Sequence, residues 1–197
     1  MKKVILASMI GLFVVSTSCK KETEVTSPVE RSSSVGSSET SGEHFIGEHF
    51  GGGIIFYLDK SGKHGLIAST ADPEEPAVWS RIDTLNRAAD TALFAGDANS
   101  RKIIKTQGFP NYDEDGYAAL SCMGLIQNGY QDWYLASKNE LEQLYKQRKV
   151  VGNFNPFSYW SSSEVDATTA WMINFGNGSR IIQVKIASNA LRPIRKF

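Results

Sequence analysis

The chain has 197 residues with 21 basic and 21 acidic side chains, so its formal net charge is zero. This balance gives no reason to expect a nucleic acid or an anionic membrane surface as a partner attracted by overall charge. Only two cysteines are present, Cys19 and Cys122, which excludes a disulfide-dense scaffold.

The N-terminus has the pattern of a secretory signal over residues 1–18. Lys2 and Lys3 precede an apolar run from Val4 to Val15, which is shorter than the roughly 20 apolar residues that span a bilayer. The small residues before Cys19 resemble a lipobox, after which the cysteine is diacylated, although Ser16 stands where most lipoboxes have leucine. We therefore expect lipidation of Cys19 and a membrane attachment through that anchor. The alternative is an ordinary signal peptide with a cysteine there by chance.

Residues 19–43 are predicted to form a lipidated, disordered tether. They are rich in Ser, Thr and Glu and contain no aromatic residue, so they cannot bury enough apolar surface to offset the entropy of ordering. Lys20-Lys21-Glu22 resembles charged signals that send some Bacteroidetes lipoproteins to the outer surface. We expect an outer membrane lipoprotein, either surface-exposed or facing the periplasm.

Residues 44–197 have the composition and length of one globular domain. The apolar run Gly53–Leu58 predicts a buried strand, and a turn at residues 59–62 joins it to a second strand over Gly65–Ser69. Three glycines at residues 51–53 predict a bend or a close backbone approach.

Three helices are predicted in the middle of the domain. One covers Asp97–Gln107 and ends at Gly108. A second covers Tyr117–Gln127 and ends at Asn128-Gly129, since both residues tolerate a left-handed cap. The third starts at Ser137-Lys138-Asn139-Glu140, which is a capping box sequence.

The last forty residues read as strands. One begins at Tyr159, and Ala170–Phe175 with Arg180–Ile186 predict a hairpin around Gly176-Asn177-Gly178. We expect Leu191–Phe197 to pair beside the first strand. Strands at both ends with helices between them predict an α+β domain with antiparallel sheets, two or three short helices, and adjacent N- and C-terminal strands.

Seven motifs in order resemble one bacterial family. They are Gly52-Gly53-Ile54-Ile55-Phe56-Tyr57, His64-Gly65-Leu66-Ile67-Ala68, Ala118-Ala119 with Cys122, Asp132-Trp133-Tyr134-Leu135 running into Ser137-Lys138-Asn139-Glu140-Leu141, Tyr159-Trp160-Ser161-Ser162-Ser163-Glu164, Ala170-Trp171 with Asn174-Phe175, and Leu191-Arg192-Pro193-Ile194-Arg195. Together they are similar to the domain at the C-terminus of the Legionella collagen-like adhesin. The resemblance covers nearly all of residues 50–197 and departs at Ala136, where the family usually has proline.

The resemblance implies a C-type-lectin-like fold related to the formylglycine-generating enzymes. In the adhesin the domain is trimeric and binds sulfated glycosaminoglycans, so a trimer and a basic ligand-binding surface are expectations for this chain. Candidate basic residues with no acidic residue among them are Arg180, Lys185, Arg192, Arg195 and Lys196. The alternative is that these are ordinary solvated strand charges.

A calcium site is one candidate for a metal. Asn111, Asp113 and Asp115 place oxygen ligands at alternate positions before Gly116, as in the first half of an EF-hand loop. Cys122 stands where such a loop needs a bidentate glutamate. The competing interpretation is a polar turn that caps the following helix, and no other cofactor is expected.

No catalytic motif is recognised. Cys122 has no partner for paired-cysteine chemistry, and the histidines lack ligand spacing. The glycan-binding motifs of true C-type lectins are also missing. Among the tryptophans, Trp79 follows a polar, proline-containing loop and is the first candidate for contact with a ligand.

The sequence thus favours a membrane-anchored binding module at the cell envelope or surface, with a glycan or another envelope polymer as its ligand. One alternative is a protein-binding adhesion or assembly factor. The other is an enzyme with a dispersed site, which would require Asp113, Asp115, Glu164 or Asp166 to lie with a histidine in one cleft.

Overall fold

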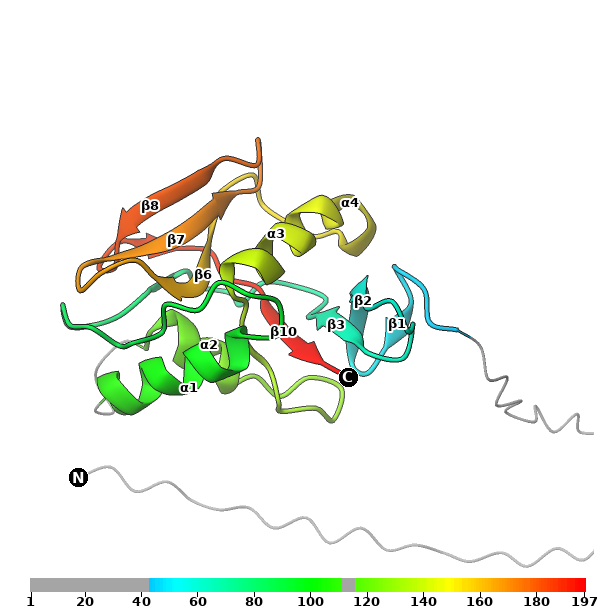
Figure 1. Ribbon diagram of the computed structural model, residues 1–197, viewed down its shortest axis with the longest axis horizontal. Helices are drawn as coiled ribbons and strands as arrows, with labels where there is room; N and C mark the ends of the chain where they lie inside the picture. Colours follow the sequence, from blue (N-terminus) through cyan, green and yellow to red (C-terminus); the bar gives the residue numbers. More distant parts are fainter. Residues whose placement is uncertain (1–42, 111–115) are drawn as a thin grey trace, which may run out of the picture. The chain divides into compact units, whose positions relative to one another are not determined.

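The computed structural model describes residues 43–110 and 116–197. The expected signal, Cys19, most of the tether and the candidate calcium ligands Asn111, Asp113 and Asp115 lie outside these ranges. Within them the chain is a mixed α+β structure with antiparallel sheets (Figure 1). No helix among the described residues is long and apolar enough to cross a membrane.

The largest sheet has five strands in the order β1-β2-β3-β10-β5, and all its pairs are antiparallel. The strands are β1 (His49–Phe50), β2 (Gly53–Leu58), β3 (Gly65–Ala68), β10 (Pro193–Lys196) and β5 (Tyr134–Leu135). The predicted first hairpin is confirmed. The pairing expected for the last strand is wrong, because β10 lies beside β3 and not beside β2. The other edge of β2 is already occupied by β1.

Gly51 and Gly52, just before β2, form the turn that brings β1 onto the outer edge of β2. Gly51 and Gly52 have φ values of 55° and 86°, a backbone region that side chains disfavour. A Cβ at Gly53 would lie 2.1 Å from the carbonyl oxygen of Ala68 on β3. The predicted close backbone approach is therefore present at Gly53, and the turn at Gly51-Gly52 allows β1 to fold back onto β2.

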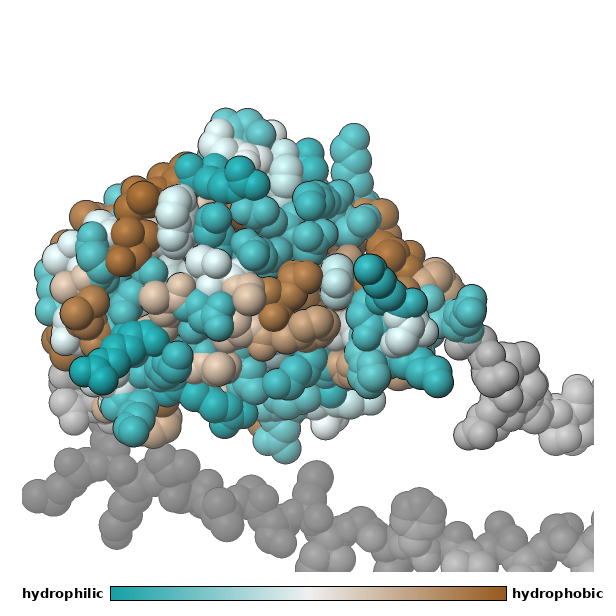
Figure 2. Space-filling model, in the orientation of Figure 1, coloured by the Kyte–Doolittle hydropathy of each residue, from teal (hydrophilic) through white to brown (hydrophobic). Residues whose placement is uncertain are grey.

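A second sheet has three strands and a third sheet has two. The strands are β6 (Ser158–Glu164), β7 (Thr169–Asn174) and β8 (Arg180–Val184) in the second, and β4 (Ala77–Val78) and β9 (Ser188–Asn189) in the third. The hairpin predicted around residues 176–178 is the β7–β8 connection. On β8, Ile182 and Val184 are exposed, as is Ile186 just after the strand. Figure 2 shows apolar side chains gathered in this region.

Four helices are present in the described residues: α1 (Gly96–Gln107), α2 (Ala118–Met123), α3 (Lys138–Lys146) and α4 (Arg148–Val151). The first is close to its prediction and ends at Gly108. The second is shorter than predicted and ends at Gly124. Asn128 and Gly129 do adopt positive φ, but they make a tight turn between Gln127 and Tyr130 instead of a helix cap.

The capping box at the start of α3 is confirmed. The Glu140 amide donates to Ser137 Oγ at 3.3 Å, and the Ser137 amide donates to Glu140 Oε2 at 2.6 Å. Glu140 is fully buried and also accepts from the Tyr134 hydroxyl at 3.2 Å. Burial raises the pKa of Glu140, although these hydrogen bonds oppose the shift. The box thus ties α3 to strand β5.

The core has two main parts. In one, α3 packs Leu141 and Leu144 against Phe56 and Leu66 of the large sheet. In the other, Trp79 and Trp160 pack with residues of α1 and α2 that include Ile103 and Cys122. Burial raises the pKa of the Cys122 thiol well above its usual value, so this thiol is held neutral and inert.

Candidate functional site

Arg192 is fully buried and its guanidinium is fully engaged. Nε donates to Asp72 Oδ1 at 2.5 Å, and Nη2 donates to the Asn153 carbonyl at 2.5 Å. Nη1 donates to the Ser69 carbonyl at 3.0 Å, and the group stacks 3.9 Å from the centroid of the Phe154 ring. Arg192 is therefore a structural residue with no free face for a ligand.

Lys185 is also fully buried, in a different part of the fold. Its Nζ donates to Glu164 Oε2 at 3.0 Å and to the carbonyl oxygens of Thr84 and Ala167 at 3.1 and 3.0 Å. Burial alone would raise the pKa of Glu164, but the Asn86 amide and Lys185 together hold it below its usual value. The ammonium is enclosed and cannot reach solvent.

The other three basic candidates are paired too. Arg180 Nε donates to Glu142 Oε1 at 2.5 Å, and Lys196 Nζ lies 3.1 Å from Asp97 Oδ2. Arg195 makes a two-point contact with Asp132 at 2.7 and 2.8 Å, and this hydrogen bonding lowers the pKa of the Asp132 carboxyl.

The basic candidates Arg180, Lys185, Arg192, Arg195 and Lys196 therefore do not form one open basic surface, because Lys185 and Arg192 are enclosed and the other three are held in ion pairs. The sequence shows no acidic residue among them, but the fold brings one to each from 21 to 120 residues away. Three of the five are buried. Sulfated polymers select basic surfaces, and the enclosed Lys185 and Arg192 cannot contribute to one.

Trp79 does not meet its expected role either. The side chain is fully buried, and Nε1 donates to the Ser161 carbonyl at 2.7 Å. The Lys185 ammonium lies 4.6 Å from the centroid of its ring. Trp79 is a core residue that joins strand β6 to the buried Lys185, so it is not a ligand contact.

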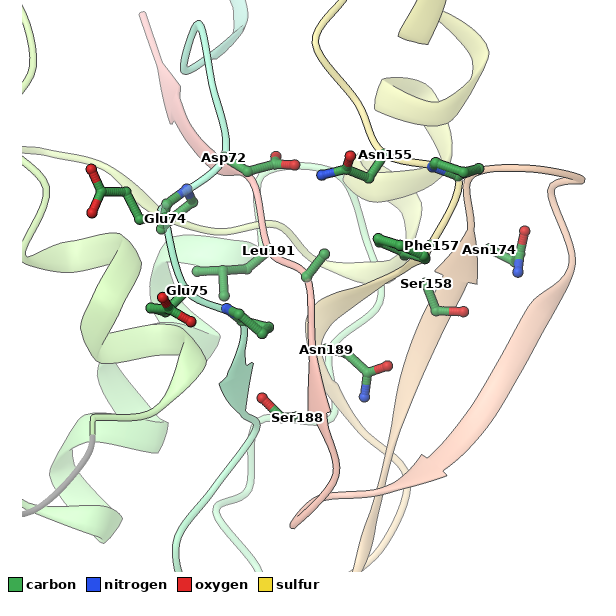
Figure 3. Close-up of a pocket in the computed structure, with 14 residues that line it drawn as sticks. Asp72, Glu74, Glu75, Asn155, Phe157, Ser158, Asn174, Ser188, Asn189 and Leu191 are labelled. Carbon is green, nitrogen blue, oxygen red and sulfur yellow. The ribbon is translucent and has the colours of Figure 1, made fainter.

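The structure brings together a cleft that no sequence motif identifies. It has a volume of about 580 Å³ and lies between the loop at residues 72–76, the segment at residues 155–158 that leads into β6, and the segment at residues 188–191 that includes β9 (Figure 3). Asn174, at the end of β7, completes the wall. This size is within the usual range of small-molecule sites.

One wall of the cleft is fixed by the buried Arg192. Asp72 lines the cleft and binds Arg192 through Oδ1, while Oδ2 accepts from the Tyr159 hydroxyl at 2.5 Å. The same hydroxyl accepts from the Asn155 amide at 2.9 Å, which holds the opposite segment. Burial and then the Asp72 carboxylate raise the pKa of Tyr159, so its hydroxyl keeps its proton.

Several polar groups in the cleft are left available. Asn174 Oδ1 accepts from the amides of Gly176 and Asn177, which directs its Nδ2 donor away from that loop. Asn189 Nδ2 makes one long contact of 3.4 Å with the Ala187 carbonyl, which leaves its Oδ1. The hydroxyls of Ser158 and Ser188 have no hydrogen-bond partner within the described ranges. Figure 3 shows these side chains around the cleft.

The cleft has acidic residues and one exposed aromatic ring. Its lining includes Asp72, Glu74 and Glu75 but no lysine, arginine or histidine. Neither Glu74 nor Glu75 has an ion-pair partner in residues 43–110 and 116–197. Phe157 is 63% exposed at the cleft, so its ring is available for contact with a ligand.

The described residues do not bring together the enzyme site that was considered from the sequence, in which carboxylates would lie with a histidine in one cleft. Glu164 is engaged by Lys185, and Asp166 Oδ1 accepts from the amides of Thr168 and Thr169. No group of three or more His, Cys, Asp or Glu that could hold a metal occurs in the described part of the chain. Asp113 and Asp115 lie outside it, so that part of the hypothesis stays a prediction.

Comparisons with known proteins place most of this structure in a family. The sequence model of the Lcl C-terminal domain matches residues 70–195. No curated protein matches the chain. A crystal structure of a fimbrial protein from Bacteroides ovatus is similar at 14% identity with a TM-score of 0.44, over 72% of this chain and 43% of that one. The chain thus spans less than half the length of that protein, and a TM-score of 0.44 supports no conclusion about function.

Proposed function

The chain belongs to the Lcl C-terminal domain family, and from that premise we propose that it is a membrane-anchored binding module of the cell envelope or surface, with a glycan or another envelope polymer as its ligand. The cleft between residues 72–76, 155–158 and 188–191 is the proposed binding site. The observation that carries this proposal is a cleft whose hydrogen-bonding side chains are free, while the charged residues behind it are occupied.

The chemistry of the cleft supports a binder. Sites for small molecules and sugar units combine apolar or aromatic surface with a few well-placed polar groups. The cleft offers the exposed Phe157, the Asn174 amide and the hydroxyls of Ser158 and Ser188. Because Asp72 is held by Arg192 and Tyr159, the wall is organised before a ligand arrives.

The lipid anchor at Cys19 and the location in the outer membrane are part of the same proposal. The lipobox-like sequence before Cys19 and the charged residues after it support an outer membrane lipoprotein. Mass spectrometry of the chain from its native membrane should show a diacylated Cys19 as the first residue. An unmodified Cys19 would contradict the proposed lipid anchor. Protease shaving of whole cells distinguishes the two faces of the membrane, since a protected domain lies in the periplasm.

We also propose a C-type-lectin-like fold, which is more specific than the mixed α+β structure described above. It is supported by the antiparallel arrangement and by a last strand, β10, in the same sheet as the first hairpin. Trimeric assembly is a prediction from the family, checked by light scattering of the full chain in detergent.

The test of the binding function is a polysaccharide array probed with the full chain in detergent micelles. We expect binding to at least one polymer, and weaker binding by the Phe157→Ala variant. Phe45→Ala is the matched control, because Phe45 is equally exposed at 63% but does not line the cleft. Failure to bind any polysaccharide, with or without calcium, would contradict the proposal.

A protein partner is the second candidate, and strand β8 favours it. The strand lies at the edge of its sheet and presents Ile182 and Val184, at 50% and 46% exposure. Exposed apolar edge strands pair readily with another chain. A stoichiometric partner recovered from native envelope, and lost with Ile182→Lys, would support this alternative.

A further inference from the structure

The absence of any cation from the cleft lining decides which ligands can enter it. An anionic group that leaves water is strongly destabilised unless a positive charge compensates it. Arg192 lies behind the wall, where it binds Asp72, and its four hydrogen bonds go to Asp72, Ser69, Gly152 and Asn153. No charge is left over to neutralise a sulfate or a carboxylate.

Unpaired carboxylates at Glu74 and Glu75 strengthen this selection. Both are exposed residues of the cleft, and neither is neutralised by a partner in the described ranges. They repel an approaching polyanion while accepting hydrogen bonds from neutral hydroxyl groups. Discrimination against the wrong ligand by like-charge repulsion is a common route to specificity.

The free hydrogen-bonding groups fit hydroxyl-rich ligands. The Asn174 Nδ2 group is a donor, Asn189 Oδ1 is an acceptor, and the hydroxyls of Ser158 and Ser188 are both. A sugar hydroxyl also donates and accepts, so it can bridge neighbouring members of this set. The Phe157 ring adds an apolar face against which the C–H face of a sugar ring can pack.

We propose that the cleft binds uncharged sugar units, with hydroxyl or acetamido substituents, and rejects sulfated and carboxylated polymers. This inference rests on the proposed glycan-binding function and narrows it to one chemical class. It also separates this chain from the expectation of a sulfated ligand, because the basic residues that supported that expectation are all paired within the protein.

The experiment uses polymer pairs that share a backbone and differ in sulfation, with the full chain in detergent micelles. Suitable pairs are dextran with dextran sulfate, cellulose oligosaccharides with their sulfated forms, and oligomers of N-acetylglucosamine with their O-sulfated forms. We expect one neutral polymer to bind at least tenfold more tightly than its sulfated counterpart. Its affinity should change less than twofold between 50 and 500 mM salt, because no ion pair contributes.

Two variants with matched controls locate the effect. Phe157→Ala should weaken binding of the neutral polymer at least tenfold, while Phe45→Ala should leave it unchanged. Replacing Glu74 and Glu75 together by lysine should raise the affinity for the sulfated counterpart at least tenfold. Glu43→Lys is the charge control, since Glu43 is exposed and outside the cleft. Thermal unfolding of each variant checks that the fold is intact.

The outcomes separate this inference from the function on which it rests. Equal or tighter binding of the sulfated counterpart overturns the inference and leaves glycan binding in place. Neutral-polymer binding that Phe157→Ala leaves unchanged also overturns it, as does binding of the sulfated counterpart that the double lysine variant leaves unchanged, because the site then lies elsewhere. Binding to no polymer of either kind overturns both.

Discussion

Arg192 behind the cleft and Glu75 on its lining are both charged, but the fold uses them differently. Arg192 is buried with hydrogen bonds to four residues, whereas Glu75 is exposed with no ion-pair partner in the described part of the chain. Residues whose bonding capacity is filled, such as Arg192, hold the wall in place. Residues with capacity left, such as Glu75, are the ones that the proposed binding function would use.

The largest expected effect comes from removing Arg192. Arg192→Met leaves Asp72 without its charged partner, so we expect a loss of about 3–5 kcal/mol in the free energy of unfolding. Urea unfolding followed by tryptophan fluorescence measures it. Arg180→Met is the control, because the Arg180 side chain is 59% exposed and its pair with Glu142 contributes at most about 1 kcal/mol. Equal losses in both variants would break the comparison.

Tyr159→Phe should have the next largest effect. It removes the hydroxyl that donates to Asp72 and accepts from the Asn155 amide, at a cost of about 1–3 kcal/mol in stability. Because both partners belong to the cleft wall, ligand affinity should fall as well. Unchanged stability and affinity together would show that the wall does not depend on the hydroxyl.

A smaller effect is expected from the pH dependence of the pair Lys185–Glu164. The pKa of Glu164 is lowered in the folded protein, so the folded state binds fewer protons than the unfolded state near the usual value of 4.5. Stability from this group is present above pH 4.5 and is lost as the pH falls through the folded pKa. The double variant Lys185→Met with Glu164→Gln should show a flatter decline in acid, measured by urea unfolding at several pH values. An identical decline would assign the acid sensitivity to other groups.

The smallest effect on stability is expected on the cleft side. Ser188→Ala removes a hydroxyl that bonds to nothing in the described residues, so stability should change by less than about 0.5 kcal/mol. Affinity for the ligand should nevertheless fall severalfold, which isothermal titration with the bound polymer would measure. Loss of stability without loss of affinity would place Ser188 with the structural residues.

Local elements of the fold were predictable because their signals lie within a few residues. Strand β2 is an uninterrupted apolar run, and the capping box at Ser137 needs only Glu140 three residues later. The end of α2 was not predictable in this way. Asn128-Gly129 has the same positive-φ preference in a tight turn as in a helix cap, so only the pairing of Gln127 with Tyr130 distinguishes the two.

The candidate site depends on contacts that are distant in sequence. Asp72 and Arg192 are separated by 120 residues, and Arg195 and Asp132 by 63. Because the sequence does not show these distant partners, the basic residues near the C-terminus look like a surface cluster. Prolines at residues 73, 76 and 156 lie in the loops of the cleft, but nothing in the sequence shows that those loops face each other.

The turn at Gly51-Gly52 also has a mechanical consequence. Strand β1 is two residues long and pairs with β2 alone, at the outer edge of the sheet. We therefore expect a force applied at residue 43 to separate the β1–β2 residue pairs one after another. The inner pairing of β3 with β10 carries the force only after that. The rings of His44 and Phe50 against Phe197 resist the first step. We therefore expect this end of the sheet to open before the inner strands when the domain is pulled from its N-terminal side.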